Sequence, residues 1–289
     1  MKHLPLLRDA DTIIAVNIRF GEMTTDGYDL FDLPKMSAQL VHSHASDAEL
    51  GKVYIADLPL QAGPNAMADA LSEITLVEDE NRQTWCADAK ASYEASFTIS
   101  PQPGALDMGA VLTHIRGVLP EDAIITNGAG NFATWPNKDM RLLAPQSGAM
   151  GYGLPAALAA KAFDPDRFVL CFAGDGDFQM NCAELGTAMQ AGLYPIVLIV
   201  NNASYGTIRM HQERNYPHRV SGTDLQNPDF VGLAKSYGFY GERVETTDQF
   251  AGAFERALQS KTGAILDLVV ATEAITPRQS IADLRKAAD

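Results

Sequence analysis

The feature that most constrains the fold is a pair of short runs that carry no polar face. Residues 167–173 read RFVLCFA and residues 195–200 read PIVLIV. Strands that are apolar on both faces occur at the centre of a parallel sheet covered by helices on both sides. A helical pattern over 178–192 joins the two runs, and strands connected in this way often lie next to each other. We therefore predict an α/β fold built on a parallel sheet with helices on both faces.

The same alternation of apolar runs and helical patterns continues through the rest of the chain. Further strands are predicted at 12–16, 38–43, 52–57, 123–126 and 264–270, and further helices at 64–74, 77–95, 108–119, 155–163, 228–238 and 247–259. Two prolines and a glycine in residues 100–107 predict a linker between two parts of the chain.

Composition excludes several classes of function. The net charge is −14, from 22 basic and 36 acidic residues, which argues against nucleic acid or an anionic membrane as the main partner. The three cysteines show neither metal-ligand spacing nor a disulfide framework. No signal peptide and no apolar run of about 18 residues is apparent. We therefore expect a soluble, cytoplasmic protein.

Polar residues follow both of the fully apolar strands. Asp175 lies in a Gly-Asp-Gly turn after the first strand, and Asn202 ends an Asn-Asn pair after the second. Carboxyl ends of neighbouring parallel strands share one edge, where open α/β sheets bind ligands. Carboxylate and amide oxygens suit Mg²⁺, which completes its shell with phosphate oxygens and water. A helix beginning near Phe178 would favour a phosphate, and Gly176 would let the backbone approach it. The residues predict a metal-bridged diphosphate.

The spacing of these motifs resembles a known family. Asn202 lies 27 positions after Asp175, and this pattern resembles the diphosphate- and metal-binding motif of thiamine-diphosphate enzymes. Residues 147–162 (SGAMGYGLPAALAAKA), 201–213 (NNASYGTIRMHQE) and 125–135 (ITNGAGNFATW) resemble other segments of that family. The order matches the acetolactate synthase, pyruvate oxidase and benzoylformate decarboxylase group over about residues 105–280.

The resemblance implies a role for each matching residue around the metal and the diphosphate. It implies that the side chains of Asp175 and Asn202 and the backbone oxygen of Ser204 bind Mg²⁺. It also implies that Gly176 and Asp177 offer backbone amides to the diphosphate of thiamine diphosphate.

Four further residues are implied around the rest of the cofactor. Gly130 and Asn131 would lie near the diphosphate from the other side. The Gly148 carbonyl would accept a hydrogen bond from the 4′-amino group. Met150 would be the apolar wedge that keeps the cofactor bent.

The resemblance also implies a division of the chain, into residues 1–100 as a partial Rossmann-like middle domain with a linker and residues 101–289 as the diphosphate-binding domain. Residues 8–75 resemble the second half of the family's middle domain, and nothing in residues 1–104 resembles its pyrimidine-binding domain. The catalytic glutamate of the family belongs to that domain and cannot be assigned here. We therefore expect no activity without the missing half, and bound FAD, which some acetolactate synthases carry on the middle domain, is doubtful.

The expected function is the part of an acetolactate synthase-like enzyme that binds thiamine diphosphate and Mg²⁺ and acts on 2-keto acids. Decarboxylation and carboligation both remain open. The expected partners are a second copy, in a homo-oligomer, or a separate chain carrying the pyrimidine-binding domain. One alternative is a non-catalytic cofactor-binding or assembly subunit. Another is a dinucleotide-binding oxidoreductase, because residues 128–133 match G-x-G-x-x-A.

Overall fold

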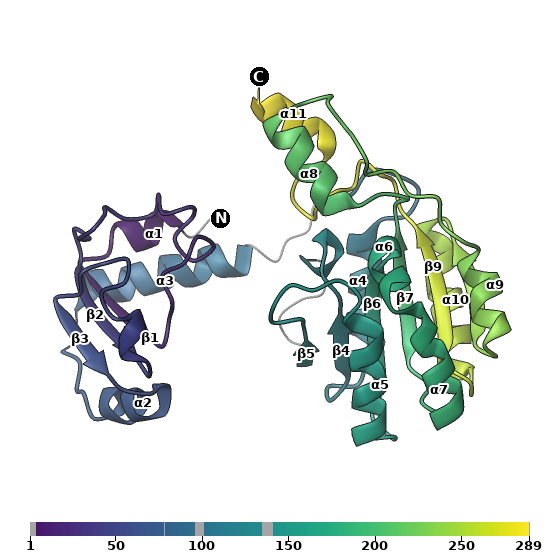
Figure 1. Ribbon diagram of the computed structural model, residues 1–289, viewed down its shortest axis with the longest axis horizontal. Helices are drawn as coiled ribbons and strands as arrows, with labels where there is room; N and C mark the ends of the chain where they lie inside the picture. The colour runs from purple at the N-terminus through teal and green to yellow at the C-terminus, as the bar shows by residue number, and fades with distance from the viewer. Residues whose placement is uncertain (1–3, 78, 96–100, 135–140, 289) are drawn as a thin grey trace. The chain divides into compact units, whose positions relative to one another are not determined.

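The computed structural model of the chain describes residues 4–77, 79–95, 101–134 and 141–288. The chain forms two compact units, Met1–Thr98 and Ile99–Asp289 (Figure 1). Among the described residues, none of the helices combines the length and the apolar character needed to cross a membrane.

The first unit is built on a small parallel sheet in the order β1-β2-β3. Its elements are α1 (Leu4–Arg8), β1 (Thr12–Val16), β2 (Gln39–His44), the 3-10 helix η1 (Asp47–Glu49), β3 (Leu58–Gln61), α2 (Pro64–Ser72) and α3 (Glu80–Ala95). Its core contains Phe20, Met36, Leu40 and Tyr54, and the rings of Phe20 and Tyr54 meet edge to face.

The predicted strand at 52–57 is wrong, because the third strand starts at Leu58. Residues 52–57 instead anchor the sheet through their side chains. Tyr54 is buried in the core, and the Asp57 carboxylate accepts a hydrogen bond from the Leu40 amide at 2.9 Å. The strand β3 contains Pro59 and lies at the sheet edge, where a missing amide hydrogen is tolerated.

The second unit is built on a six-stranded parallel sheet in the order β5-β4-β6-β7-β9-β8. Its strands are β4 (Ile124–Asn127), β5 (Arg141–Leu143), β6 (Val169–Gly174), β7 (Ile196–Asn201), β8 (Tyr240–Val244) and β9 (Ala264–Val269). The two fully apolar runs became β6 and β7, which pair directly with Leu170 opposite Ile196. The predicted α/β class and the predicted neighbouring strands are confirmed.

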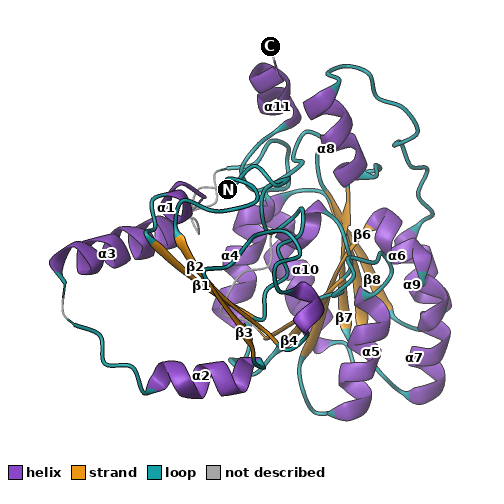
Figure 2. Cartoon of the chain, turned by 60° about the vertical axis from the view of Figure 1, so that its left-hand side comes forward, coloured by secondary structure: helices purple, strands orange, loops and turns teal. Residues whose placement is uncertain are grey.

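Helices cover both faces of this sheet (Figure 2). The helices of this unit are α4 (Met108–Val118), the 3-10 helix η2 (Asn131–Thr134), α5 (Gly153–Phe163), α6 (Asp175–Met180), the 3-10 helix η3 (Cys182–Glu184), α7 (Leu185–Ala191), α8 (Gly206–Asn215), α9 (Phe230–Ser236), α10 (Thr247–Gln259) and α11 (Ile281–Ala288).

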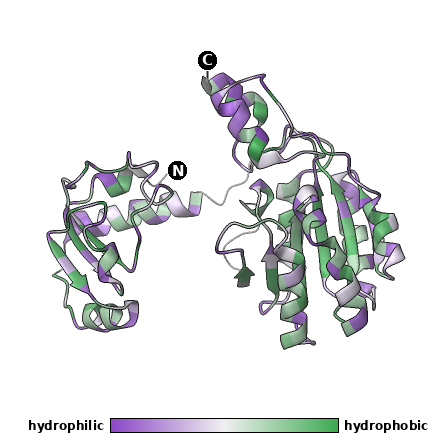
Figure 3. Cartoon of the chain, in the orientation of Figure 1, coloured by the Kyte–Doolittle hydropathy of each residue, from purple (hydrophilic) through white to green (hydrophobic). Residues whose placement is uncertain are grey.

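Alternate side chains of the central strands serve the two faces. Leu170 and Phe172 of β6 belong to one core cluster together with residues of α4 and α10. Val169 and Cys171 belong to a second cluster with residues of α5, α7 and α9. Figure 3 shows these strands as the apolar centre of the unit. The lack of a polar face in the sequence is thus explained by burial on both sides.

The predicted helix over 178–192 is corrected in two respects. The helical backbone already begins at Asp175, and it breaks at Asn181 before continuing as η3 and α7. The side-chain amide of Asn181 donates to the Gly151 carbonyl at 2.9 Å. The backbone of Asn181 is non-helical, with φ −136° and ψ 24°. This tertiary hydrogen bond holds the break. As predicted, the helix ends at Gly192, which has φ +66°.

The last helix packs on α8, although neither helix was predicted from the sequence (Figure 1). Glu213 of α8 is fully buried, and Arg285 of α11 donates to both of its carboxylate oxygens, at 2.8 and 2.5 Å. The Arg285 guanidinium holds the pKa of Glu213 at about 2. Ile281 and Leu284 of α11 pack beside Ile275 and complete the contact with an apolar cluster.

We expect Arg285→Ala to destabilise the second unit, because the buried Glu213 carboxylate loses its bidentate partner. The cost should be on the order of 2 kcal/mol, as for hydrogen bonds to a charged group. The folded pKa of Glu213 lies below its unfolded value of about 4.3. The ion pair therefore stabilises fully above that pH, and its contribution is lost as pH falls towards 2.

Thermal unfolding of the wild type and of Arg285→Ala from pH 7 to pH 2 measures this contribution. The difference in melting temperature should be constant above pH 5 and shrink below pH 4. Lys286→Ala, an exposed change on the same helix, is the control. A difference that does not depend on pH would contradict the assignment.

Candidate functional site

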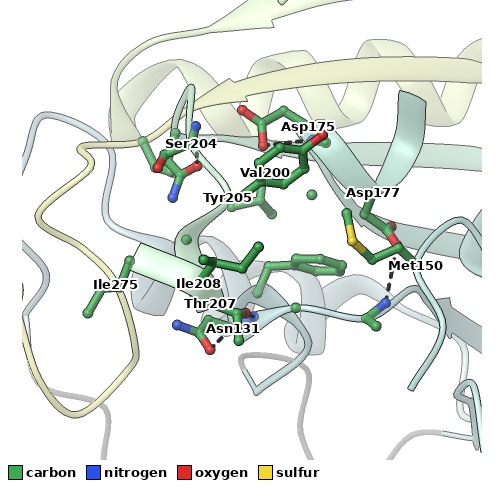
Figure 4. Close-up of a pocket in the computed structure, with 18 of the residues that line it drawn as sticks. Asn131, Met150, Asp175, Asp177, Val200, Ser204, Tyr205, Thr207, Ile208 and Ile275 are labelled. Atoms are coloured by element: carbon green, nitrogen blue, oxygen red, sulfur yellow. Dashed lines mark hydrogen bonds between the residues drawn. The ribbon is translucent and has the colours of Figure 1, made fainter. Parts of the chain in front are cut away.

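The strand order places a switch point between β4 and β6. The chain runs from β4 to β5 on one side and then returns to β6 on the other side of β4. Open α/β sheets bind ligands at the carboxyl edge beside such a point. The loops after β4, β6 and β7 surround a cavity of about 410 Å³ at this edge (Figure 4).

All nine residues implied by the resemblance line this cavity. They are Gly130, Asn131, Gly148, Met150, Asp175, Gly176, Asp177, Asn202 and Ser204. They come from four separate segments of the chain, and the fold brings all of them to one place. Their roles toward a cofactor stay predictions.

Asp175 is the carboxylate at the end of β6. Its side chain is buried, Gly176 donates a backbone hydrogen bond to Oδ1 at 2.9 Å, and Asn227 donates to Oδ2 at 2.7 Å. Burial raises the pKa of Asp175, and these hydrogen bonds act in the opposite direction. Each carboxylate oxygen has two lone pairs, so this pattern leaves acceptor capacity on both oxygens.

The turn after β7 holds the second predicted metal ligand. Asn202 Oδ1 accepts from the Ser204 amide at 3.0 Å, and its backbone oxygen accepts from the Thr272 hydroxyl at 3.1 Å. Between them, Ala203 has φ +51°, a conformation that costs energy in a residue with a Cβ. Ser204 is buried and donates from its hydroxyl to the Thr223 carbonyl at 3.0 Å. The turn is therefore tightly specified.

Asp177 has a side-chain role that the sequence prediction missed. Its Oδ1 accepts from the backbone amides of Ala129 at 3.1 Å and Gly151 at 2.7 Å, while Oδ2 is buried and has no hydrogen-bond partner among the residues that the structure describes. Burial raises the pKa of Asp177 to about 6. A Cβ on Gly128 would come within 1.9 Å of Oδ1. One carboxylate thus connects three pocket segments, those of α6, β4 and α5.

At two glycines of the cavity wall, an aromatic ring packs directly against the backbone. A Cβ on Gly176 would lie 2.6 Å from the Tyr205 ring, and a Cβ on Gly130 would lie 2.6 Å from the Phe132 ring. Both contacts are closer than real side chains tolerate, so aromatic rings pack directly on backbone at these positions. The expectation that Gly176 lets the backbone approach a phosphate stays a prediction.

The wall opposite Asp175 is closed by α8. The backbone amide of Asn131 donates to the Thr207 hydroxyl at 2.9 Å, and that hydroxyl donates to the side-chain oxygen Oδ1 of Asn131 at 3.1 Å. Met150 is 37% exposed and borders the cavity near Asp177 (Figure 4). Gly148 adopts φ +68°, which suits a residue without a Cβ.

The donor set fits a small hard cation. Among the described residues, no group of three or more His, Cys, Asp or Glu side chains is placed to hold a metal ion. The cavity offers one buried carboxylate and an amide oxygen from adjacent strand ends instead. Mg²⁺ is usually held by one or two carboxylates with substrate phosphates and water. The residues therefore fit a magnesium diphosphate.

Among the described residues, 101–134 and 141–288, no geometry matches the dinucleotide alternative. After β4, residues 131–134 form a short 3-10 helix, where the fingerprint calls for the start of a crossover α-helix. The Asp177 side chain also occupies the space beside Gly128. A Cβ on Gly128 or Gly130 would overlap the side chain of Asp177 or Phe132, so packing requires glycine at both positions.

Comparison with known proteins agrees with this geometry. Residues 128–268 match the family model of the thiamine pyrophosphate enzyme C-terminal TPP binding domain. The chain is 34% identical to the acetolactate synthase large subunit of Parasynechococcus marenigrum, over 91% of this chain and 44% of that protein. It is 29% identical to the acetolactate synthase isozyme 2 large subunit of Escherichia coli, over 88% of this chain and 46% of that protein.

A probable acetolactate synthase large subunit of Methanocaldococcus jannaschii is also 29% identical, over 91% of this chain and 46% of that protein. The chain thus spans less than half the length of these relatives. The predicted resemblance is confirmed: residues 128–268 match the C-terminal TPP binding domain of thiamine pyrophosphate enzymes, and the chain is homologous to acetolactate synthase large subunits over 91% of its length.

Proposed function

We propose that the second unit binds thiamine diphosphate through Mg²⁺ held by Asp175, Asn202 and the backbone oxygen of Ser204. One observation carries this proposal: the carboxylate and the amide lie at the ends of the paired strands β6 and β7 and line one cavity. The segments 125–135, 147–162 and 201–213, which resemble the family, all contribute residues that line this cavity.

The remaining residues would position the cofactor. Gly130, Asn131, Gly176 and Asp177 would contact the diphosphate, while the Gly148 carbonyl and the Met150 side chain would hold the aminopyrimidine end. When bound, thiamine diphosphate supplies a thiazolium carbon that adds to a 2-keto acid and takes up the electrons left by CO₂. The protein contributes binding, orientation and a dry environment.

We further propose that the whole enzyme acts on 2-keto acids, by decarboxylation or carboligation, as the relation to acetolactate synthases suggests. In this proposal the first unit is part of the middle domain, and the pyrimidine-binding domain with its glutamate comes from outside residues 1–289. A separate chain would supply that domain, and the other proposed partner is a second copy in a homo-oligomer. The three free cysteines support a cytoplasmic location.

The first test is a calorimetric titration of thiamine diphosphate with MgCl₂ into the purified chain. We expect saturable binding that disappears when EDTA removes the metal. Asp175→Ala should weaken binding by more than ~100-fold, since loss of a metal ligand exceeds the typical effect of an outer-shell change. Asp166→Ala, which removes an exposed carboxylate, is the matched control.

Metal-independent binding, or equal binding by Asp175→Ala, would contradict the proposed site. If the wild type binds nothing, the titration is repeated with a supplied pyrimidine-binding domain of an acetolactate synthase. Failure in that mixture as well would overturn the proposal.

A second test concerns the Asp177 clamp, by which we mean the two hydrogen bonds from Ala129 and Gly151 to the Asp177 carboxylate. Asp177→Ala removes the acceptor of both backbone amides, so the loops that carry Ala129 and Gly151 lose their common support. We expect cofactor affinity to fall roughly 30-fold, at about 1 kcal/mol for each of the two hydrogen bonds. Asp177→Asn keeps one acceptor oxygen and should stay within roughly threefold of the wild type. Equal losses in both variants would contradict the clamp.

Turnover provides a third test. We expect the chain alone to convert no pyruvate at saturating cofactor, because the glutamate that activates the cofactor in this family has not been found in it. Adding a pyrimidine-binding domain should restore 2-keto acid consumption, followed as CO₂ release and by assay for acetolactate. Turnover by the purified chain alone would contradict the proposal. Cofactor binding without turnover in the mixture would favour a non-catalytic subunit.

A further inference from the structure

A hydrogen-bonded side-chain network lies behind the carboxylate of Asp175, outside the set of residues that line the cavity. Asn227, in the loop before α9, donates from its amide nitrogen to Asp175 Oδ2 at 2.7 Å and to Asn201 Oδ1 at 2.8 Å. It therefore bridges the ends of β6 and β7. None of the roles proposed above involves it.

The orientation of this amide is fixed from the other side. Asn227 Oδ1 accepts a hydrogen bond from Gln179 Nε2 at 3.0 Å, and Gln179 lies on α6, the helix that starts at Asp175. The nitrogen must then face Asp175 and Asn201, which both present oxygen acceptors. A side chain with a single donor, such as a hydroxyl, could not donate to both acceptors at once.

The network continues across the sheet through the first asparagine of the Asn-Asn pair. Asn201 Nδ2 donates to Asp267 Oδ1 of β9 at 2.8 Å, and Asp267 Oδ2 lies 3.2 Å from Arg243 Nε of β8. Asn201 and Asp267 are both buried. The network thus spans β6, β7, β9 and β8, and it ends at the carboxylate that faces the cavity.

This arrangement separates the roles of the two asparagines. Asn202 lines the cavity, whereas Asn201 supports the position from which Asn227 contacts Asp175. With Gly176 bonded to Oδ1 and Asn227 bonded to Oδ2, the carboxylate cannot rotate without breaking a buried hydrogen bond. Its remaining lone pairs are consequently held in a fixed direction.

We propose that Asn227 is a positioning residue that orients the Asp175 carboxylate for Mg²⁺, supported by Gln179 and Asn201. The inference rests on the proposed binding of magnesium and thiamine diphosphate. Mg²⁺ demands near-octahedral geometry at short distance, whereas Ca²⁺ accepts irregular sites. Loss of the orienting contact should therefore weaken Mg²⁺ more than Ca²⁺.

The experiment compares the full-length chain with Asn227→Ala by calorimetry. MgCl₂ and, separately, CaCl₂ are titrated in the presence of saturating thiamine diphosphate. For Asn227→Ala we expect Mg²⁺ affinity to fall ~10- to 100-fold, the usual range for residues that orient metal ligands. Ca²⁺ affinity should fall by a smaller factor. Gln226→Ala changes an exposed residue of the same loop and should match the wild type for both ions.

Three results decide the matter. If wild type and Asn227→Ala bind Mg²⁺ within twofold of each other, the positioning role is overturned while the proposed function stands. If both ions weaken equally, the effect is general loosening of the loop, and the positioning role is again overturned. If the wild type shows no metal-dependent cofactor binding even with a supplied pyrimidine-binding domain, the proposed function fails, and this inference fails with it.

If Asn227→Ala does not fold, a less disruptive substitution tests the same contact. Should Asn227→Ala show no cooperative unfolding transition, Gln179→Ala takes its place. It leaves Asn227 present and removes the donor that fixes its amide, together with a 3.3 Å hydrogen bond to the Asp175 carbonyl. We expect a smaller loss of Mg²⁺ affinity with the same preference over Ca²⁺. Unchanged Mg²⁺ affinity in Gln179→Ala would then overturn the proposal.

Discussion

Burial of β6 and β7 on both faces is the constraint on which the rest of the second unit depends. Side chains such as Leu170 and Cys171 point to opposite helical layers, and both are fully buried. Burying one large apolar side chain is worth about 1.5–3 kcal/mol, so a strand buried on both faces is strongly fixed in register. The ends of these strands are consequently fixed as well, and they carry Asp175 and Asn202.

The fixed strand ends hold two buried aspartates at the edge of the sheet. A buried carboxylate is costly unless it is hydrogen-bonded, and the two aspartates after β6 are hydrogen-bonded in different ways. Asp175 is held by a backbone amide and by Asn227, and both of its oxygens keep acceptor capacity. Asp177 uses one oxygen to hold Ala129 and Gly151. The first keeps acceptor capacity at the cavity, and the second holds together the segments that form the cavity wall.

The far wall of the cavity depends on the C-terminal end of the described chain. Helix α8 follows directly from the turn that holds Asn202, and its Thr207 closes on Asn131. The pair between Glu213 and Arg285 then fastens α11 to α8. The position of α8, and with it one side of the cavity, is therefore coupled to a helix about 70 residues further along the chain.

By itself, the sequence determined the α/β class, the neighbouring central strands and the meeting of Asp175, Gly176 and Asn202 at one edge, because strand periodicity and motif spacing are local properties. The other six residues of the site came from the family resemblance. The sequence did not determine the start of β3, the break at Asn181 or the contact of Asn227 with Asp175. Each of these depends on a hydrogen bond between distant segments, such as the one from Asn227 to Asp175, 52 positions away. Only the tertiary structure decided them, since no local pattern records which buried acceptor a distant side chain will satisfy.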